Sequence, residues 1–300
     1  MMKRLVGVFA PVVTTFYPHN GELDAASFAA NIRAHVAAGL HGVVVAGSTG
    51  EAALLDAVER ATMVDLAREM VPHDRMLIAG TGAESTRTCL QLTRDAAARG
   101  ADAVLVVAPH YYGAAMTGPA LVRHYRRIAD ESPLPVMLYN IPKYMHFALA
   151  PGLVSELSVH ENVIGIKDSS GDRALLASYL EAQSETFTVL TGNAGTFRHA
   201  LAAGARGGIL AVALFAAGLS LEVYDAAVRG DATAADGAQA RLAPLGATIV
   251  GEMGVAGVKA AMDRVGLVGG GVRSPLLPLD EPRSALVAEL LRSAELATAA

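Results

Sequence analysis

The sequence predicts an α/β protein in which eight parallel strands close into a (β/α)8 barrel, followed by a C-terminal helical extension. Two observations lead to this fold class. Short runs of Val, Ile, Leu and Ala recur along the chain, and helical stretches rich in Ala and Arg follow them. The apolar runs are continuous rather than alternating, which indicates strands that are buried on both faces, as in parallel sheets.

The expected elements alternate regularly. Strands that alternate with helices form βα units, and right-handed crossovers place the helices outside a parallel sheet. Three of the helices end at Gly39, Gly100 or Gly204, and glycine is preferred there because it adopts positive φ. The expected strands are residues 5–13, 42–46, 76–80, 103–108, 135–139, 163–167, 186–190 and 208–212. The expected helices, which carry apolar residues at three- and four-residue spacing, are residues 24–38, 56–70, 85–99, 118–131, 172–181 and 195–203.

Eight strands fit a single closed barrel, whose usual length is about 250 residues. We assign residues 1–218 to the barrel with the active site and residues 219–300 to a C-terminal helical segment, which is interrupted by prolines. A doubly wound open sheet is the structural alternative. Residues 8–14, at the end of the first strand, lack the Gly-x-Gly-x-x-Gly turn of dinucleotide-binding sheets, and this weakens that alternative.

Composition excludes several classes of function. Hydrophobic residues make up 52% of the 300 residues, so a large core is expected, and the net charge of −5 without basic runs argues against nucleic-acid binding. The apolar runs are too short for a membrane span. The single Cys89 fits a reducing cytoplasm, and the nine histidines form no compact metal-ligand pattern. We therefore expect a cytoplasmic protein of the size of an enzyme, without a metal site.

Lys167 ends an otherwise apolar run, Val163-Ile164-Gly165-Ile166, and lysine is rarely buried without a specific reason. Full burial lowers the pKa of a lysine from about 10.4 by up to several units. The neutral amine that results attacks ketones and forms imines. The alternative is a structural lysine that reaches solvent or pairs with the adjacent Asp168. The strand pattern alone leaves both interpretations open.

Other strand ends also carry polar groups. The Gly47-Ser48-Thr49-Gly50-Glu51 loop offers backbone N–H groups and two hydroxyls to an anion such as a carboxylate, or it is an ordinary turn with a helix cap. The glycine-rich turn at 192–195 leaves the same two interpretations open. Tyr139, which ends the fifth strand, could relay protons or simply pack its ring with a hydrated hydroxyl.

Taken in order, these motifs resemble the dihydrodipicolinate synthase and N-acetylneuraminate lyase superfamily. The resemblance covers nearly the whole chain, and the spacing agrees because Tyr139 lies 28 residues ahead of Lys167. The matching motifs are Ala-Pro-Val-Val-Thr at 10–14, Gly-Ser-Thr-Gly-Glu at 47–51, Tyr-Asn-Ile-Pro at 139–142, Gly-Ile-Lys-Asp at 165–168, Gly-Val-Lys at 257–259 and Pro-Leu-Leu-Pro-Leu at 275–279.

The resemblance implies a class I aldolase, a carbon–carbon lyase that works without a cofactor. It implies that Lys167 forms an imine with pyruvate or another 2-keto acid and that Tyr139 shuttles the proton. Ser48 and Thr49, with Gly47 in the same loop, would hold the carboxylate of the keto acid. Family members are usually homotetramers built as dimers of dimers.

Three further residues take their roles from the same resemblance. Tyr111 would complete a hydroxyl relay with Ser48 and Tyr139 from across a subunit interface. Ile209 would line the pocket beside the imine, and Gly192 belongs to the turn that faces the substrate.

Two departures from the family pattern concern the second substrate. Synthases that make dihydrodipicolinate place an arginine after the Tyr-Asn-x-Pro turn to grip the distal carboxylate of the aldehyde. Tyr144 occupies that position here, and a tyrosine cannot supply a bidentate charged fork. Sialic-acid lyases carry acidic residues where this chain has its 192–195 turn.

We therefore expect a substrate of the 2-keto-3-deoxy sugar acid or 4-hydroxy-2-oxoglutarate type. An aromatic aldehyde is also conceivable, given the aromatic residues that follow the turn. One alternative is a 4-hydroxy-tetrahydrodipicolinate synthase that joins pyruvate to aspartate semialdehyde. An alternative of another class is a non-catalytic barrel that binds a keto acid.

Overall fold

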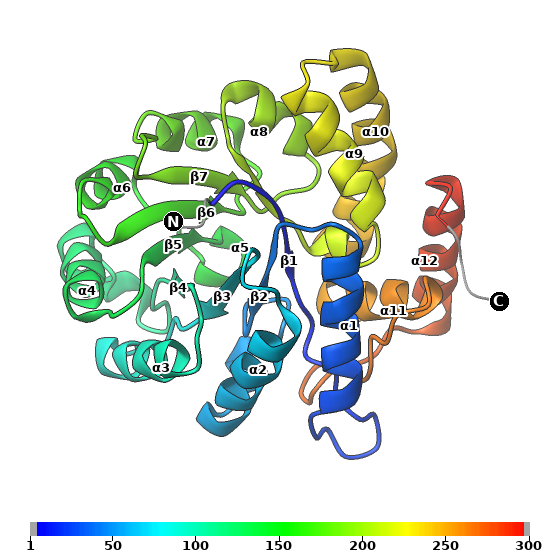
Figure 1. Ribbon diagram of the computed structural model, residues 1–300, viewed down its shortest axis with the longest axis horizontal. Helices are drawn as coiled ribbons and strands as arrows, with labels where there is room; N and C mark the ends of the chain where they lie inside the picture. The colour runs from blue at the N-terminus through cyan, green and yellow to red at the C-terminus, as the bar shows by residue number, and fades with distance from the viewer. Residues whose placement is uncertain (1–4, 297–300) are drawn as a thin grey trace.

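The computed structural model describes residues 5–296, and in it eight parallel strands form a closed barrel in chain order (Figure 1). The barrel closes where β8 pairs with β1, with Phe9 opposite Ile209. The predicted fold class is confirmed. Residues 1–4 and 297–300, which the predicted barrel and C-terminal segments include, lie outside the described range. The strands are β1 (Gly7–Pro11), β2 (Gly42–Val45), β3 (Met76–Gly80), β4 (Ala103–Val107), β5 (Val136–Asn140), β6 (Val163–Asp168), β7 (Thr188–Thr191) and β8 (Gly207–Ile209).

All eight predicted strands exist, but some of their bounds were wrong. β7 begins two residues later than expected, and β8 ends at Ile209 because the chain turns into the 3-10 helix η3 (Ala211–Leu214). The apolar run continues from β8 through η3 because both elements are buried. An apolar run without alternation does not distinguish a strand from a short buried helix.

Helices surround the barrel (Figure 1). Aspartate or serine side chains cap four of them by accepting a backbone N–H: Asp24, Asp56, Ser85 and Asp172. Such caps satisfy N–H groups that have no partner inside the helix. The helices that follow the strands in turn are α1 (Ala25–Ala37), α2 (Ala57–Met70), α3 (Thr86–Ala98), α4 (Gly118–Glu131), α6 (Pro151–Ser158), α7 (Arg173–Leu180), α8 (Phe197–Ala203) and α9 (Ala217–Val228).

The three predicted helix-ending glycines behave as expected, since Gly39, Gly100 and Gly204 all have positive φ. Two helices between β5 and β6 were missing from the prediction: α6 and the single turn α5 (Pro142–Met145). Each begins with a proline, which suits the first turn of a helix. Both are too short to produce a clear helical period in the sequence.

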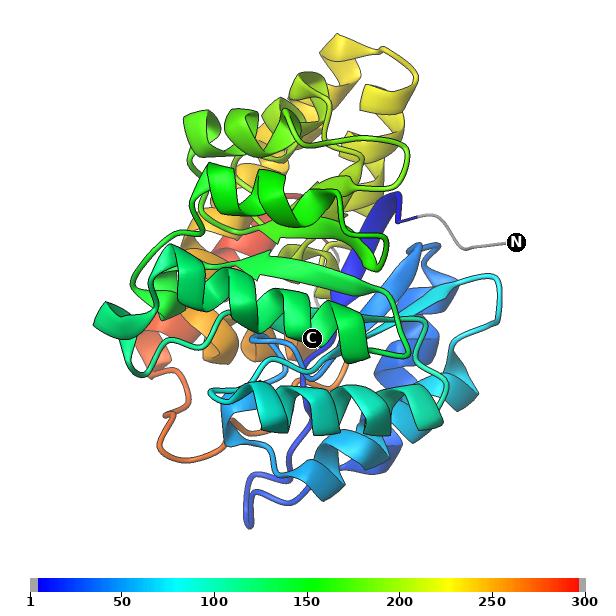
Figure 2. The ribbon, with the colours of Figure 1, turned by 90° about the vertical axis from the view of Figure 1, so that its left-hand side faces the viewer.

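The C-terminal segment packs beside α1 and α9 in Figure 1, and α11 and α12 lie on the side away from the N-terminus in Figure 2. Its elements are α10 (Ala232–Pro244), the π-helix η4 (Leu245–Glu252), α11 (Gly254–Arg264) and α12 (Glu281–Ser293). The π-helix follows directly after Pro244, which cannot donate a helical hydrogen bond. The domain boundary at residue 218 stays a prediction. Across residues 5–296, no helix combines the length and apolar character needed to cross a membrane.

Candidate active site

A cavity of about 260 Å³ lies among the loops that follow the carboxyl ends of the strands. In (β/α)8 barrels this is the end where active sites are found. The cavity gathers seven of the nine site residues predicted from the sequence: Ser48, Thr49, Tyr139, Tyr144, Lys167, Gly192 and Ile209. Gly47 is buried and does not line the cavity, and Tyr111 lies elsewhere.

Lys167 lies near the end of β6 and is only 5% exposed. Its register partner on β5 is Tyr139, and the lysine Nζ lies 4.2 Å from the centroid of the tyrosine ring. Because both side chains point into the cavity, the amine lies in a confined space with an aromatic wall. An amine held in this way is available to a ketone that enters the cavity.

Asp168 is adjacent to Lys167 in sequence but does not pair with it. Successive side chains of a strand point to opposite faces, and Asp168 turns away from the cavity. Its carboxylate accepts hydrogen bonds from Asn140 Nδ2 at 2.8 Å and from the Ser170 hydroxyl at 2.8 Å. Burial raises the pKa of Asp168, and these hydrogen bonds oppose the rise. The interpretation of Lys167 as the ion-pair partner of Asp168 is therefore wrong.

Gly192 provides the space that the Lys167 side chain occupies. A Cβ atom at this position would collide with the Ser169 hydroxyl and lie 2.9 Å from Lys167 Cε. The Gly192 N–H donates to the Asp168 carbonyl at 2.6 Å, which fixes the turn against β6. Only glycine therefore fits at 192 without moving the lysine.

The loop at 47–51 is held in an unusual conformation. It is bounded by two non-glycine residues with positive φ, Ala46 at 50° and Glu51 at 57°. Such residues are uncommon and concentrate at functional sites. The Thr14 hydroxyl donates to the Gly50 carbonyl at 2.5 Å. The half-buried Ser48 and Thr49 face the cavity, where their hydroxyls and the loop N–H groups can receive a carboxylate.

The outer part of the cavity has a different lining. Tyr144 borders it, and burial raises the pKa of this phenol, with a smaller contribution from Tyr139. Lys143 also lies at the cavity, and its Nζ donates to the Gly251 carbonyl of the π-helix at 2.6 Å. Part of the wall comes from the C-terminal segment, which the sequence analysis did not connect to the site: Gly246, Val250, Gly251, Gly254, Val255 and Val258.

Tyr111 lies outside the cavity and is 78% exposed. Its ring packs edge-on against Tyr112, and its backbone N–H donates to Glu84 Oε2 at 2.9 Å. A neighbouring groove of about 710 Å³ shares Ser48 and Tyr144 with the cavity. A single chain therefore does not bring Tyr111 together with the other predicted catalytic residues.

Three charged residues near the site were not predicted to act there. Glu51 and Lys259 belong to motifs noted in the sequence but were given no role, and Arg273 was not singled out. Lys259 and Glu51 form a buried ion pair at 2.5 Å. No group of three or more His, Cys, Asp or Glu side chains in the described part of the chain is arranged to hold a metal ion.

Comparison with known proteins gives a consistent result. Residues 4–294 match the model of the dihydrodipicolinate synthetase family. A 4-hydroxy-tetrahydrodipicolinate synthase from Methanoculleus marisnigri is 33% identical over 287 residues, which are 95% of this chain and 98% of that protein.

Two solved structures are also similar. Dihydrodipicolinate synthase DapA-2 from Bacillus anthracis has a TM-score of 0.92 and 30% identity, over 97% of this chain and 99% of the other. The second is YagE from E. coli K12, a prophage protein of the dihydrodipicolinic acid synthase family in complex with pyruvate. It has a TM-score of 0.91 and 32% identity, over 97% of this chain and 99% of the other. The chain therefore belongs to the dihydrodipicolinate synthetase family, and it is a carbon–carbon lyase of the lysine Schiff-base class.

Proposed function

We propose that this enzyme makes or cleaves a carbon–carbon bond between pyruvate and an aldehyde through an imine on Lys167. The observation that carries the proposal is the buried Lys167 amine, which faces Tyr139 inside a cavity bordered by Ser48 and Thr49. The solved relative YagE, described in complex with pyruvate, supports the choice of keto acid.

The chemistry follows from the positions of these groups. Lys167 Nζ attacks the keto carbon of pyruvate, and loss of water leaves an imine. Tyr139 donates a proton to the departing hydroxyl. Loss of a proton from the methyl carbon then gives an enamine. The enamine carbon forms a bond to the aldehyde carbon, whose oxygen takes up a proton, and water releases the product from Lys167. The loop at 47–51 holds the carboxylate throughout.

Borohydride trapping tests the imine directly. Reduction in the presence of pyruvate is expected to add a three-carbon adduct at Lys167, located by peptide mass spectrometry. The Lys167→Ala variant is the control and should remain unmodified. A folded wild-type protein without the adduct would exclude the imine mechanism. Equal turnover of 2-keto acids by wild type and Lys167→Ala would do the same, and absence of turnover with retained binding would favour a non-catalytic barrel.

For the aldehyde, we propose a fragment derived from a 2-keto-3-deoxy sugar acid or from 4-hydroxy-2-oxoglutarate. Tyr144 holds the position from which the family's arginine grips a distal carboxylate, and the nearby Lys143 ammonium is engaged by the Gly251 carbonyl. Ser169 and Asn193 also line the cavity, and their hydroxyl and amide groups suit hydrogen bonding to a hydroxylated chain.

The second candidate is a 4-hydroxy-tetrahydrodipicolinate synthase acting on aspartate semialdehyde. The observation that favours it is the similarity of this chain to three 4-hydroxy-tetrahydrodipicolinate synthases, each at least 33% identical. An assay with pyruvate and aspartate semialdehyde, coupled to a reductase for the cyclic product, separates the two candidates. Turnover with this aldehyde above that with sugar-derived aldehydes would establish the synthase.

We further propose that the active unit is a dimer within a tetramer and that it works in the cytoplasm. The exposed Tyr111 and the groove that shares Ser48 with the cavity support a close contact between two copies. In such a dimer, Tyr111 of one copy would reach the Ser48 and Tyr139 hydroxyls of the other. Sedimentation of wild type, together with activity recovered by mixing Tyr111→Phe and Lys167→Ala variants, tests this arrangement.

A further inference from the structure

Glu51 carries a fully buried carboxylate at the end of the loop that faces the cavity. One carboxylate oxygen, Oε1, pairs with Lys259 Nζ at 2.5 Å, and the two side chains are 0% and 2% exposed. The other oxygen, Oε2, accepts the backbone N–H of Arg273 at 2.8 Å. Both partners come from the C-terminal segment, more than 200 residues away in sequence. One side chain thus joins the second βα loop to this distant segment.

Lys259 makes further contacts besides its ion pair with Glu51. Its ammonium also donates to the Gly271 carbonyl at 2.5 Å and lies 4.8 Å from the centroid of the Phe16 ring. Burial lowers the pKa of Lys259, and the Glu51 carboxylate opposes this change. The ion pair keeps both groups charged in a place where either alone would be strongly disfavoured.

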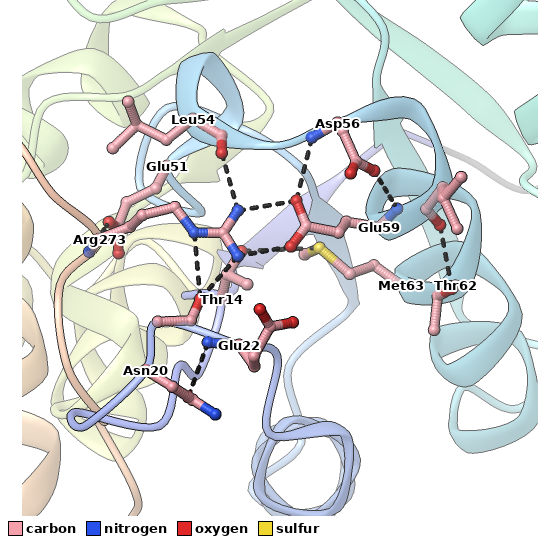
Figure 3. Close-up of polar contacts among 12 residues, drawn as sticks. Thr14, Asn20, Glu22, Glu51, Leu54, Asp56, Glu59, Thr62, Met63 and Arg273 are labelled. Atoms are coloured by element: carbon pink, nitrogen blue, oxygen red, sulfur yellow. Dashed lines mark hydrogen bonds and ion pairs between the residues drawn. The ribbon is translucent and has the colours of Figure 1, made fainter.

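Arg273 extends the network outward (Figure 3). Its guanidinium binds both carboxylate oxygens of Glu59 at 2.5 and 2.7 Å, and it donates to the Leu54 carbonyl at 2.8 Å. Glu59 belongs to the capping box at the start of α2. This outer ion pair ties the C-terminal segment to α2 and does not touch residues 47–50.

The inner pair has a direct geometric consequence for the cavity. Glu51 is in the left-handed region, so its backbone is strained, and its side-chain contacts hold it there. On the other side of the pair, Lys259 follows Val258, which lines the same cavity. The Glu51–Lys259 pair therefore connects the Ser48–Thr49 side of the cavity to its C-terminal wall.

We propose that Glu51 and Lys259 are positioning residues that set the keto-acid carboxylate site by locking the 47–51 loop against α11. This role rests on the proposed imine chemistry but is separate from it. Neither side chain lines the 260 Å³ cavity, so both act through the loop and the wall. A buried ion pair is weak evidence for net stability, so we place the role of this pair in the geometry that it holds, which a carboxylate site depends on.

The test uses a paired neutral replacement, Glu51→Gln with Lys259→Met, because a single charge removal would leave the other charge buried. The matched control is Glu59→Gln, which breaks the outer ion pair with Arg273 but leaves the loop contacts in place. For each protein, borohydride trapping at Lys167 is titrated with pyruvate and with methyl pyruvate, which lacks the free carboxylate. Circular dichroism and thermal melting report the folding of each variant.

The double variant is expected to need about tenfold to a hundredfold more pyruvate for half-maximal trapping, a typical effect of a small misplacement of a binding group. The concentration of methyl pyruvate needed for half-maximal trapping should change less than twofold, because methyl pyruvate has no free carboxylate for the loop to bind. The Glu59→Gln control should keep both values within twofold of wild type.

Equal half-saturation by pyruvate in the double variant and wild type would overturn the proposal. So would an equal loss in Glu59→Gln, because the effect would then be one of general stability. If the double variant does not fold, the Glu51→Asp variant, which keeps the charge but shortens the side chain, decides the question by the same ratio of pyruvate to methyl pyruvate. Failure of the wild type to trap pyruvate at all would instead reject the imine mechanism.

Discussion

Tyr139 and Lys167 are register partners on neighbouring strands, and the lysine amine lies over the face of the tyrosine ring, 4.2 Å from its centroid. This contact does not involve the tyrosine hydroxyl. The structural role of the ring and the chemical role of the hydroxyl can therefore be separated by mutation.

Replacing Tyr139 by phenylalanine keeps the ring but removes the hydroxyl. We expect kcat to fall by about 10²–10⁴-fold, the usual contribution of a general acid or base, while the melting temperature stays near that of wild type. Steady-state kinetics and the rate of borohydride trapping measure the effect. A kcat within twofold of wild type would show that another group relays the proton.

Replacing Gly192 by alanine should displace the lysine. The added Cβ would lie 2.9 Å from Lys167 Cε and would collide with the Ser169 hydroxyl, so imine formation is expected to fall at least tenfold. Gly218→Ala is the matched control, because a Cβ there meets nothing within 4 Å. Trapping with pyruvate measures both variants, and equal trapping in the two would refute the steric requirement at 192.

Replacing Tyr144 by arginine should change the preference for the aldehyde. A guanidinium can form charge-assisted hydrogen bonds to a carboxylate, worth about 1.5–3 kcal/mol each, or about tenfold or more in affinity. We expect the ratio of kcat/KM for aspartate semialdehyde over an uncharged aldehyde to rise by at least that factor. Tyr144→Phe, which adds no charge, should leave the ratio low. An unchanged ratio in Tyr144→Arg would mean that the distal carboxylate binds elsewhere.

His35 on α1 should make stability depend on acid pH. Burial lowers the pKa of His35 from 6.5 to about 4, and its Nε2 has no hydrogen-bond partner within residues 5–296. Between pH 6.5 and 4 the unfolded chain binds a proton that the folded protein does not. The free energy of unfolding therefore falls as pH falls through this window.

The His35→Leu variant tests this contribution. The slope of unfolding free energy against pH between 4 and 6.5 should decrease by up to about 1.4 kcal/mol per pH unit. Urea unfolding of wild type and variant at pH 7 and pH 4.5 measures the slope. Identical slopes in the two proteins would show that folding does not lower the pKa of His35.

Local sequence patterns were sufficient for the barrel and for most of the cavity. Eight apolar runs separated by helical stretches predict a parallel sheet, and the missing Gly-x-Gly-x-x-Gly turn favours a closed barrel over an open sheet. The carboxyl ends of parallel strands gather at one end of a barrel. Residues at those ends, such as Ser48, Tyr139 and Lys167, therefore had to lie close together. The short helices α5 and α6 escaped prediction because one or two turns carry too little periodic signal.

Contacts between distant segments could not be predicted in the same way. The C-terminal wall of the cavity and the Glu51–Lys259 pair depend on how α11 packs against the barrel, and no local pattern encodes that packing. The position of Tyr111 on the surface likewise depends on the whole assembled face of the molecule.

Lys167 illustrates the division between sequence and tertiary structure. By itself, the sequence determined that a lysine ends an apolar strand beside an aspartate, and it left open whether the two form a pair. The tertiary structure decided the question. Strand alternation sends Lys167 into the cavity, while Asn140 and Ser170 hold Asp168 on the opposite face. The physical reason is that a strand specifies two faces, but only the closed barrel specifies which face is the cavity.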